Sequence, residues 1–447
     1  MPNPPGVSWE MRIQLAIVPG LPDQVFFMWE LLVWELLVWE LHGAIHMNDD
    51  TKLNKFNSTR AVHDGALRVK AYNSLIDPIV QNATYTFADT NDLREYMDRT
   101  LLGIDDSRIE YGRNGNPTVR AAEKRIASLE GADDCALFGS GMAAITTLLL
   151  AFLGAEQHLI VTEESYRRSH QLCVDVFRRF GVTCSVVPVG NYQALEEAIR
   201  PETKMIFSES PTNPYLRCID LERFSDIAKR NNVLSVIDST FATPLNLQPL
   251  KYGVDLVVHS GSKYLAGHND ILAGALCGRE YLVGIVRQLL GTVGSILAPE
   301  QASLLIRGLK TLGLRVSRHN DNGQSVAKFL EAHSKVDRVW YPGLRSHPDY
   351  QIANQQMMGC GGVVSFEVKG GGDAAGKIVD AVRIPYIAPS LGGVESLIEQ
   401  PAIMSYYDLE PEERSELGIK DNLVRLAVGI EDSVDLIDDL GQALDKV

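Results

Sequence analysis

The sequence predicts an α/β fold built around a mostly parallel β-sheet. Short apolar strands alternate with amphipathic helical stretches through the middle of the chain, which is the pattern of consecutive βαβ units. The expected strands include His158–Thr162, Cys184–Pro188 and Lys204–Ser208. In open parallel sheets, ligands bind outside the carboxyl ends of the strands. We therefore look for functional residues where the predicted strands end.

One predicted strand, from Val254, leads into the turn Ser260-Gly-Ser-Lys263. A lysine forms an imine with a carbonyl compound only when its amine is deprotonated, which burial or a neighbouring cation brings about. The hydroxyl groups of Ser260 and Ser262 are suited to donate hydrogen bonds to a phosphate. The turn therefore indicates a Schiff-base lysine for an aldehyde that carries a phosphate, although a solvated surface lysine fits this fragment alone equally well.

Asp238 ends another predicted strand, Leu234–Asp238, one crossover before the lysine. A carboxylate at this edge can pair with a protonated pyridine nitrogen and keep the ring cationic, so that the ring draws electrons from a bound substrate. An aspartate after a strand is also a common turn former. The lysine strand that follows favours the interpretation as a cofactor ligand.

A phosphate site is predicted at Gly139-Ser-Gly141, where the strand Cys135–Phe138 gives way to an apolar helical stretch that runs through Leu153. Backbone N–H groups at the start of a helix are unpaired and carry the positive end of the helix dipole, so they bind anions. Gly141 and Met142 are the expected donors. A lone Gly-Ser-Gly tripeptide is ordinarily only a turn.

Together with other motifs, these elements resemble the cysteine/methionine-metabolism enzymes that use pyridoxal phosphate. The resemblance runs from about Asn57 to the C-terminus. It implies an aspartate-aminotransferase-like fold (PLP fold type I), with a large cofactor domain and a smaller C-terminal α/β domain, and pyridoxal 5′-phosphate bound to Lys263. The motifs that carry the resemblance, in chain order, are Tyr111-Gly-Arg-Asn-Gly-Asn-Pro-Thr118, Ser210-Pro-Thr-Asn-Pro214, the Asp238 strand, Ser260-Gly-Ser-Lys263 and Asn422-Leu-Val-Arg-Leu426.

The resemblance assigns cofactor roles to four further residues. Tyr111 and Arg113 are expected to enter from a neighbouring subunit and bind the phosphate, for which the guanidinium fork is suited. Tyr166 is expected to stack on the pyridine ring and assist proton transfer, and Asn213 to hydrogen-bond the phenolic oxygen of the ring.

Substrate recognition is expected at Arg425 and Ser390. Arg425 stands in an apolar run and is costly to bury unpaired, so it needs a carboxylate partner. The matched motif favours the carboxylate of an amino-acid substrate, and a structural Asp or Glu is the alternative. Pro389 stands where many relatives carry a glutamate, and Arg168 could attract an anionic leaving group. Ser262 replaces a commoner threonine but retains the hydroxyl.

Within the family, the C-terminal third is most similar to the plant-type cystathionine γ-synthases, in segments such as Tyr341–Pro348, Ile384–Ser390 and Gln400–Tyr406. This predicts a γ-replacement that joins cysteine to an activated homoserine ester, O-phosphohomoserine in our interpretation, in methionine biosynthesis by transsulfuration. A cystathionine or methionine γ-lyase and a homoserine-ester sulfhydrylase use nearly the same residues and stay open. The intact lysine and aspartate argue against a non-catalytic oligomeric regulator.

Composition agrees with a soluble enzyme. The chain has 447 residues, of which 45% are hydrophobic and 22% charged, an ordinary globular make-up. A net charge of −15 argues against nucleic-acid and anionic-membrane partners. The six cysteines show no C-x-x-C spacing, so they indicate neither a metal site nor a disulfide framework, and we expect reduced thiols.

We expect four regions along the chain. Residues 1–47 are an atypical extension with an exact repeat of Trp-Glu-Leu-Leu-Val, and we expect that they are not part of the fold. They contain no convincing targeting peptide, so a cytoplasmic or, in a plant-like source, a plastid location is expected. By the resemblance, residues 48–105 are an arm that contacts a partner subunit in a homotetramer built from dimers with shared active sites. Residues 106–305 form the cofactor domain and 306–447 the C-terminal domain, in which Gly361–Val368 is an expected strand and Gly370–Asp373 a flexible turn.

Overall fold

The structure is a computed structural model that describes residues 57–102 and 108–447. The extension expected over residues 1–47 lies outside these ranges. Within them, seven strands form a larger sheet: β1 (Asp134–Phe138), β2 (His158–Thr162), β3 (Thr183–Val187), β4 (Thr203–Glu209), β5 (Leu234–Asp238), β6 (Leu256–Ser260) and β7 (Gly274–Gly278).

The larger sheet has the order β1-β7-β6-β5-β4-β2-β3. Strands β6, β5, β4, β2 and β3 are parallel to one another, and β7 runs antiparallel to both of its neighbours, β1 and β6. The predicted mostly parallel sheet is therefore present, with one reversed strand inserted in it. The two strands that end in Asp238 and Ser260 are hydrogen-bonded neighbours.

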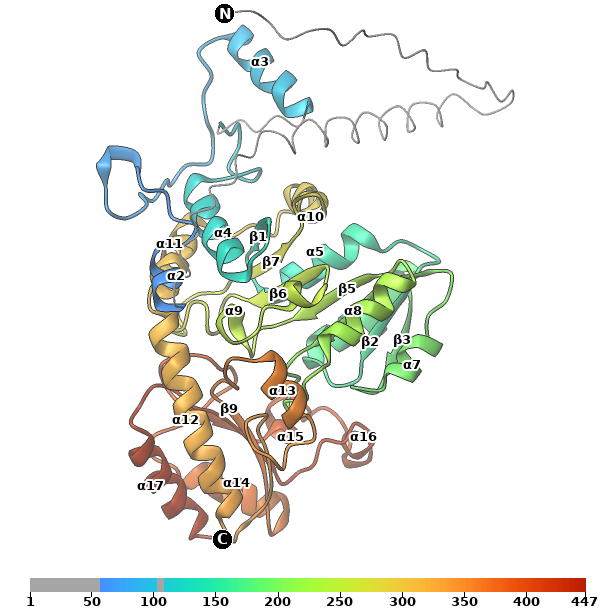
Figure 1. Cartoon of the computed structure of the whole chain (residues 1–447), viewed down its shortest axis with the longest axis vertical. Coiled ribbons are helices and arrows are strands. Elements are labelled where there is room, and N and C mark those ends of the chain that lie inside the picture. The colour runs from blue at the N-terminus through green and yellow to red at the C-terminus, as the bar shows by residue number, and fades with distance from the viewer. Residues whose placement is uncertain (1–56, 103–107) are drawn as a thin grey trace, which may run out of the picture. The chain divides into compact units, whose positions relative to one another are not determined.

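Helices cover both faces of this sheet, as expected for strands that are apolar along their whole length (Figure 1). In β2, Leu159 and Val161 pack into the apolar cluster that includes α5 and α10, whereas Ile160 belongs to the cluster on the opposite face that includes α8. This alternation is the two-residue period of a strand. The covering helices are α4 (Pro117–Glu130), α5 (Gly141–Phe152), α8 (Leu221–Arg230), α10 (Glu280–Val293) and α11 (Pro299–Leu309).

A second, smaller sheet lies in the C-terminal part. Its strands are β8 (Val336–Trp340), β9 (Val363–Val368), β10 (Tyr386–Ile387), β11 (Leu397–Glu399) and β12 (Leu423–Ala427), in the order β10-β11-β12-β9-β8. Only the β10–β11 pair is parallel. The long helix α12 (Leu312–Ala332) leads into this part (Figure 1). Its other helices are α13 (Tyr350–Gln356), α14 (Gly371–Ala381), α15 (Pro401–Met404), α16 (Pro411–Glu416) and α17 (Ser433–Leu444).

The remaining elements are short, apart from one helix in the N-terminal segment. Helices α2 (Asn57–His63) and α3 (Thr90–Leu101) belong to the segment expected to be an arm. The others are α6 (Arg167–Gln171), α7 (Tyr192–Glu197), α9 (Thr243–Asn246), the 3-10 helices η1 (Ala71–Asn73), η3 (Phe177–Phe180) and η4 (Pro249–Tyr252), and the π-helix η2 (Leu172–Val176).

The flexible turn expected at Gly370–Asp373 is wrong, because Gly371 to Asp373 form the first turn of helix α14. Gly370 precedes the helix with φ of 96°, in the left-handed region that glycine tolerates. The apolar side chains of Ala374, Ala375 and Ile378 are buried in the core of the C-terminal part. Burial of this helix face therefore outweighs the poor helix propensity of the glycines. The expectation of a turn rested on that propensity alone.

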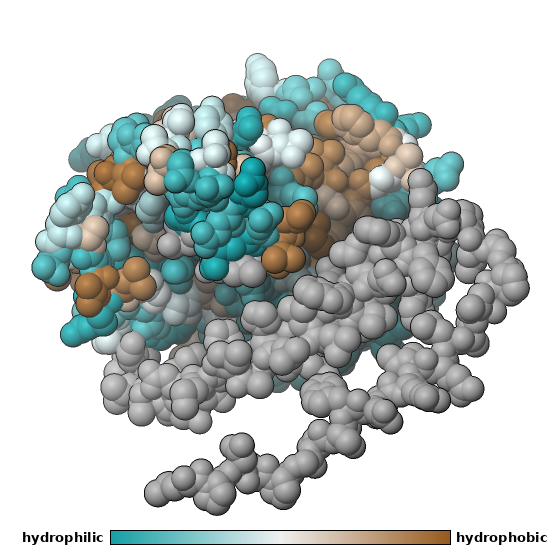
Figure 2. Space-filling model, turned by 90° about the horizontal axis from the view of Figure 1, so that it is seen from above, coloured by the Kyte–Doolittle hydropathy of each residue, from teal (hydrophilic) through white to brown (hydrophobic). Residues whose placement is uncertain are grey.

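Apolar side chains remain exposed in several places on the described surface, and Figure 2 shows brown patches among the polar residues on one face. Segment 62–79 contributes Leu67, Val69, Tyr72 and Leu75, and α10 contributes Tyr281. Among the described residues, no helix is both long enough and apolar enough to cross a membrane.

Candidate active site

A cavity of about 430 Å³ brings together residues from the carboxyl ends of β4, β5 and β6 and from the C-terminal part. It is lined by nearly all of the predicted site residues, which come from segments as far apart in sequence as Gly141 and Arg425. The predicted site residues that line the cavity are Gly141, Met142, Tyr166, Arg168, Asn213, Asp238, Ser260, Ser262, Lys263, Ser390 and Arg425.

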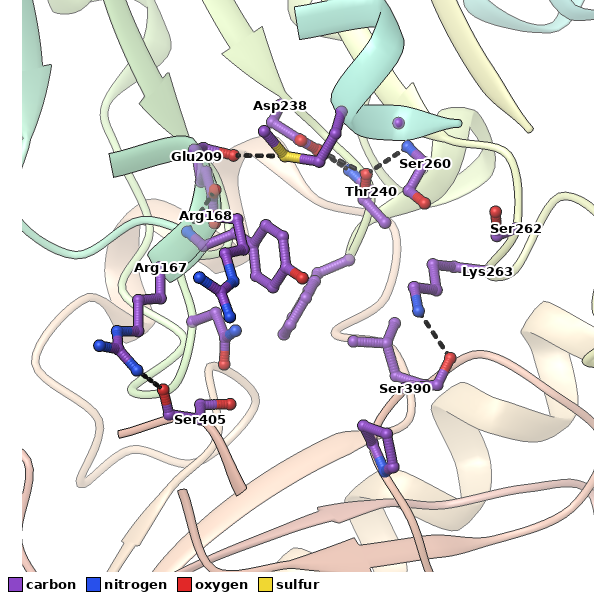
Figure 3. Close-up of a pocket in the computed structure, with 18 of the residues that line it drawn as sticks. Arg167, Arg168, Glu209, Asp238, Thr240, Ser260, Ser262, Lys263, Ser390 and Ser405 are labelled. Atoms are coloured by element: carbon purple, nitrogen blue, oxygen red, sulfur yellow. Dashed lines mark hydrogen bonds between the residues drawn. The ribbon is translucent and has the colours of Figure 1, made fainter. Parts of the chain in front are cut away.

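Lys263 is a largely buried amine at this cavity. Its Nζ donates to Oγ of Ser390 at 2.6 Å, and Figure 3 shows the two side chains facing each other. Burial, with a further contribution from the nearby cation of Arg425, lowers the pKa of Lys263 to about 8. An amine with this pKa has a far larger neutral fraction near neutral pH than an ordinary lysine and is about half deprotonated at pH 8. The neutral amine is the form that makes an imine.

The start of α5 lies against the turn that carries the lysine. Ser140 caps this helix by accepting from the backbone N–H of Ala143, and the first amides of a helix have no partner inside it. A Cβ atom at Gly141 would lie 3.0 Å from Cβ of Ser260, so only glycine fits here without displacing that serine. The helix start and the serine turn therefore form one cradle of donors for an anion.

The two serines of the turn differ in their contacts. Ser260 donates its backbone N–H to Oγ1 of Thr240 at 2.7 Å. The hydroxyl of Ser262 accepts from the N–H of Ala273 at 2.9 Å and donates to the carbonyl of the same residue at 3.3 Å. Because Ser262 already uses its hydrogen within the chain, Ser260 is the better placed donor of the two.

Thr240 also holds Asp238 in place. One oxygen of Asp238 accepts from the N–H of Thr240 at 2.9 Å and from its hydroxyl at 2.5 Å. Hydrogen bonds of this kind favour the ionised carboxylate, although burial raises the pKa of Asp238 overall. A cationic partner such as a pyridinium nitrogen would offset that burial.

Arg425, in the lining of the cavity, contacts Asn213, Ser390 and Glu399. It donates to the side-chain oxygen of Asn213 at 3.0 Å and to the carbonyl of Ser390 at 3.3 Å, and its Nη2 lies 2.8 Å from Oε1 of Glu399. Arg425 and Glu399 are directly opposite each other on β12 and β11, and both are buried. The alternative of a structural carboxylate partner is therefore realised in the structure. Nε of Arg425 remains without a hydrogen bond within the described residues, so a donor is left for a further ligand.

Ser390 has φ of 105°, a conformation that a residue other than glycine seldom adopts. Its hydroxyl accepts from Lys263 while its carbonyl accepts from Arg425. Strained backbone of this kind persists only where the surroundings over-determine it, and it is common at functional sites.

Two consecutive arginines point in different directions. Arg167 donates to the carbonyl of Ser405 and to the carboxylate of Asp408, whereas the guanidinium of Arg168 extends toward the open middle of the view in Figure 3. Arg168 is exposed, and among the described residues its side chain donates a hydrogen bond only to Gln171, at 2.8 Å. Pro389 lines the same cavity, so the two positions expected to select the leaving group lie at one site.

Tyr111 and Arg113 are absent from the described lining of this cavity. Both side chains are exposed, with the Arg113 guanidinium 5.3 Å from the centre of the Tyr111 ring. They were expected to complete the site of a neighbouring subunit, and this role stays a prediction.

Among the cavity residues that were not predicted from the sequence, Glu209, Thr240 and Glu399 contact predicted site residues through their side chains. Glu209 and Glu399 each end a buried strand, as Asp238 does. The rule that selected Asp238 would therefore have found Glu209, which follows the expected strand Lys204–Ser208 of the parallel sheet. It would not have found Glu399, because β11 pairs antiparallel with β12 in the smaller sheet. Thr240 carries no such signal, because its importance comes from joining the carboxylate of Asp238 to the backbone N–H of Ser260.

The cavity fits pyridoxal phosphate. It offers a cradle of donors for the phosphate, a carboxylate for the ring nitrogen, and an amine of lowered pKa within the same lining. Gly141 leaves room where a Cβ atom would crowd the cradle. We therefore regard the donor set as matched to this cofactor.

Comparisons with known proteins agree with this geometry. The family described as Cys/Met metabolism PLP-dependent enzyme matches residues 58–445. A chloroplastic cystathionine γ-synthase 1 from Arabidopsis thaliana is 44% identical over 394 residues, which are 86% of this chain and 69% of that protein. An L-methionine γ-lyase from Fusobacterium nucleatum is 40% identical over 392 residues, 87% of this chain and 98% of the relative.

Among solved structures, metB from Corynebacterium glutamicum superposes with a TM-score of 0.82 at 36% identity, covering 88% of this chain and 98% of that one. The aspartate-aminotransferase-like fold expected from the sequence is thereby confirmed. With the family match over most of the chain, pyridoxal phosphate is also confirmed as the cofactor. The chain belongs to the Cys/Met metabolism PLP-dependent enzymes.

Proposed function

We propose that the protein is a cystathionine γ-synthase that joins the sulfur of cysteine to Cγ of O-phosphohomoserine and releases phosphate. Two plant cystathionine γ-synthases, from Arabidopsis thaliana and Nicotiana tabacum, are 44% and 46% identical to the chain. The observation that carries the choice of donor is the joint presence of Arg168 and Pro389 at the cavity of Lys263.

The cofactor would be held by groups that the sequence and the cavity have in common. Gly141, Met142 and Ser260 would bind the phosphate through the helix start and the serine turn. Asp238 would pair with the ring nitrogen, Tyr166 would stack on the ring, and Asn213 would hydrogen-bond its phenolic oxygen. When bound, the cofactor supplies an electron sink for carbanions next to the substrate nitrogen.

Lys263 would move the protons. Once the amine of the substrate has displaced it, its free Nζ would take the proton from Cα, hand that proton on, and then, again neutral, take one from Cβ, because the group on Cγ departs only after both positions are activated. The lowered pKa, about 8, suits an amine that must accept and return protons near neutral pH. Its contact with Ser390 holds Nζ within the cavity.

Arg425 would bind the α-carboxylate of the amino-acid substrate. Its Nε has no hydrogen bond within the described chain, and charge-assisted bonds to a carboxylate are about twice as strong as neutral ones. Glu399 already neutralises part of its charge. Arg425 would thus orient the substrate rather than supply a large binding energy.

Arg168 would attract the phosphate of the donor. Its guanidinium extends toward the open middle of the view in Figure 3, whereas that of Arg167 turns to Ser405. Arg167 also donates to the carboxylate of Asp408. A glutamate at position 389 would repel a doubly negative leaving group, and the proline there removes this repulsion.

The second candidate is a γ-lyase, which uses the same residues. It is favoured by the 40% identity to an L-methionine γ-lyase over nearly the full length of that relative. In a lyase, no nucleophile would add to Cγ after the leaving group departs; Cγ would take up a proton instead, and water would hydrolyse the resulting enamine, through its imine form, to an oxoacid and ammonia. A homoserine-ester sulfhydrylase differs only in accepting sulfide.

Product analysis separates these functions. The purified holoenzyme is incubated with O-phosphohomoserine, O-succinylhomoserine or O-acetylhomoserine, each with and without cysteine, and amino acids and oxoacids are quantified. The proposal expects cystathionine from the phosphorylated donor only when cysteine is present. Oxoacid release as the main reaction in the presence of cysteine would favour the lyase, and cystathionine from the other esters alone would overturn the choice of donor.

We further propose that the enzyme works as a homo-oligomer in a reducing compartment. Tyr111 and Arg113 lie apart from the cavity of their own chain, and all six cysteines are free thiols. Two relatives are named as chloroplastic, so a plastid is one such compartment and the cytoplasm the other. Fractionation of the source cells distinguishes them.

A further inference from the structure

Glu209 is a buried carboxyl group at the cavity to which none of the roles above applies. It is the last residue of β4, and only 4% of its surface is exposed. Its Oε1 accepts from the backbone N–H of Tyr166 at 2.6 Å. No side chain caps the start of α6, the helix that Tyr166 precedes, so this contact from a strand 43 residues away fixes the backbone there.

A second carboxyl group lies beside it. Glu209 and Asp238 are paired positions in the register of β4 and β5, and the N–H of Ser210 donates to the carbonyl of Asp238 at 3.1 Å. Across the part of the chain that the structure describes, neither carboxylate forms an ion pair with an arginine, lysine or histidine. Two unpaired negative charges at neighbouring strand ends would repel each other in a site with little water.

The contacts decide which of the two keeps the charge. Asp238 accepts two hydrogen bonds from Thr240, which favour its ionised form, whereas Glu209 accepts one. Burial and the neighbouring Asp238 raise the pKa of Glu209 well above its usual range. The other titratable groups that act on this pair are Tyr406 and Cys173 near Glu209 and His259 near Asp238. Burial raises the pKa of both Tyr406 and Cys173, so neither adds a charge at neutral pH.

We propose that Glu209 positions Tyr166 as a neutral carboxylic acid, so that Asp238 alone supplies the negative charge that pairs with the ring nitrogen of the cofactor. The carbonyl oxygen of the acid accepts from Tyr166, and the hydroxyl oxygen carries the proton. Glu209 is thus a positioning residue. The inference rests on the roles proposed above for Tyr166 and Asp238, but not on the identity of the donor substrate.

Three variants of Glu209 separate its two properties. Glu209→Gln keeps the oxygen that accepts from Tyr166 and has no charge. Glu209→Asp keeps the acid but is one methylene too short for this contact, and Glu209→Ala removes both. Glu163→Gln is the matched control, because Glu163 is an exposed carboxylate in the same segment as Tyr166 and lies outside the lining of the cofactor cavity.

Each holoenzyme is titrated with alkali while the absorbance and circular dichroism of the bound cofactor are recorded, and kcat and KM are measured with the best substrate. Glu209→Gln and Glu163→Gln are both expected to leave the titration midpoint within about 0.3 pH unit of the unmodified protein. Glu209→Gln replaces one neutral group with another, and Glu163→Gln removes a charge that lies outside the cavity lining. Glu209→Ala and Glu209→Asp are expected to lower kcat about tenfold or more with little change in KM. They are also expected to weaken the circular dichroism of the cofactor, because the Tyr166 ring that would stack on it is misplaced.

Two results would overturn the inference. A midpoint displaced by about one unit or more in Glu209→Gln would mean that Glu209 is ionised in the native protein. Unchanged kcat and dichroism in folded Glu209→Asp would mean that the contact with Tyr166 does not position the ring, and this variant decides the matter if Glu209→Ala does not fold. A protein that makes no cystathionine would refute the proposed function while leaving the spectral titration fully interpretable.

Discussion

At the scale of single residues, the chemistry depends on how burial changes the charge of ordinary side chains. Lys263 is held near a pKa of about 8 because the cavity removes water from its amine and Arg425 adds a positive charge nearby. Glu399 has its pKa raised by burial and supplies the opposing charge. The amine is therefore poised between a charged and a neutral form at the pH of a cell.

The lowered pKa of Lys263 predicts how the rate of cofactor binding depends on pH. Only the neutral amine attacks the aldehyde, so the rate at which the cofactor-free protein regains its absorbance band should rise with pH and level off above about pH 8, matching the lowered pKa. A lysine with an ordinary pKa near 10.4 would give a rate that still rises at pH 9. Stopped-flow absorbance measures this profile. Lys263→Ala should show neither the band nor turnover but retain the far-ultraviolet dichroism of the fold.

Arg168 carries the prediction for the donor substrate. Arg168→Ala should raise KM for O-phosphohomoserine about tenfold, since a charge-assisted contact to phosphate is lost, and should change KM for O-acetylhomoserine less than about twofold. Arg178→Ala is the control, because Arg178 is an exposed arginine outside the cavity lining. Steady-state kinetics with both donors provide the test. Equal losses on the two donors would contradict a role for Arg168 in phosphate recognition.

At the scale of elements, the phosphate cradle is made where the start of α5 meets the end of β6. The Ser140 cap fixes the first turn of the helix, and Gly141 allows it to approach Ser260. Glu209, Asp238 and Ser260 end three neighbouring parallel strands, so the direction of the sheet places their chemistry at one edge.

Gly141→Ala tests this approach. The added Cβ would lie 3.0 to 3.2 Å from atoms of Ser260, so the serine must shift and cofactor affinity should fall about tenfold. The fold should be little affected, because the helix itself gains from alanine. Gly284→Ala in α10 is the control, since a Cβ there meets nothing within 4 Å. It should keep full affinity and stabilise the protein by about 0.5–1 kcal/mol. Equilibrium titration of the cofactor-free variants gives the affinities, and equal values would contradict the assignment of the cradle.

At the scale of the whole molecule, one chain does not supply every residue expected at the cofactor. Tyr111 and Arg113 are exposed and separate from the cavity of their own chain, and large apolar side chains such as Tyr72 and Leu75 lie exposed in the preceding segment. Where several large apolar side chains of one segment are exposed, as here, we expect a contact with a partner subunit.

Mixed oligomers provide the test of shared sites. Arg113→Ala and Lys263→Ala chains should each be inactive alone. After mixing under conditions that allow subunit exchange, some activity should return, because a hybrid contains one site with both residues intact. Exchange is verified with a mass-tagged chain. Exchanged hybrids that remain inactive would place Arg113 and Lys263 in the same chain's site.

The sequence by itself determined the class of fold, the family and the cofactor. Strand signals are local, since β2 matches His158–Thr162 and β5 matches Leu234–Asp238 as expected, and the residues at their ends follow from the direction of a parallel sheet. Helix α5 ends at Phe152, one residue before the expected Leu153. Motifs with a fixed chemical purpose, above all the serine turn before Lys263, could likewise be recognised without a structure.

The tertiary structure decided what depends on partners distant in the chain. It showed that Arg425 faces Glu399 across two antiparallel strands, that Arg167 is bound to Asp408 while Arg168 is not, and that the glycines after Gly370 begin a helix. Local sequence contains no information on these points, because strand register and the burial of a helix face are set by contacts between segments. The pairing of Glu209 with Asp238, on which the charge at the cofactor ring depends, arises for the same reason.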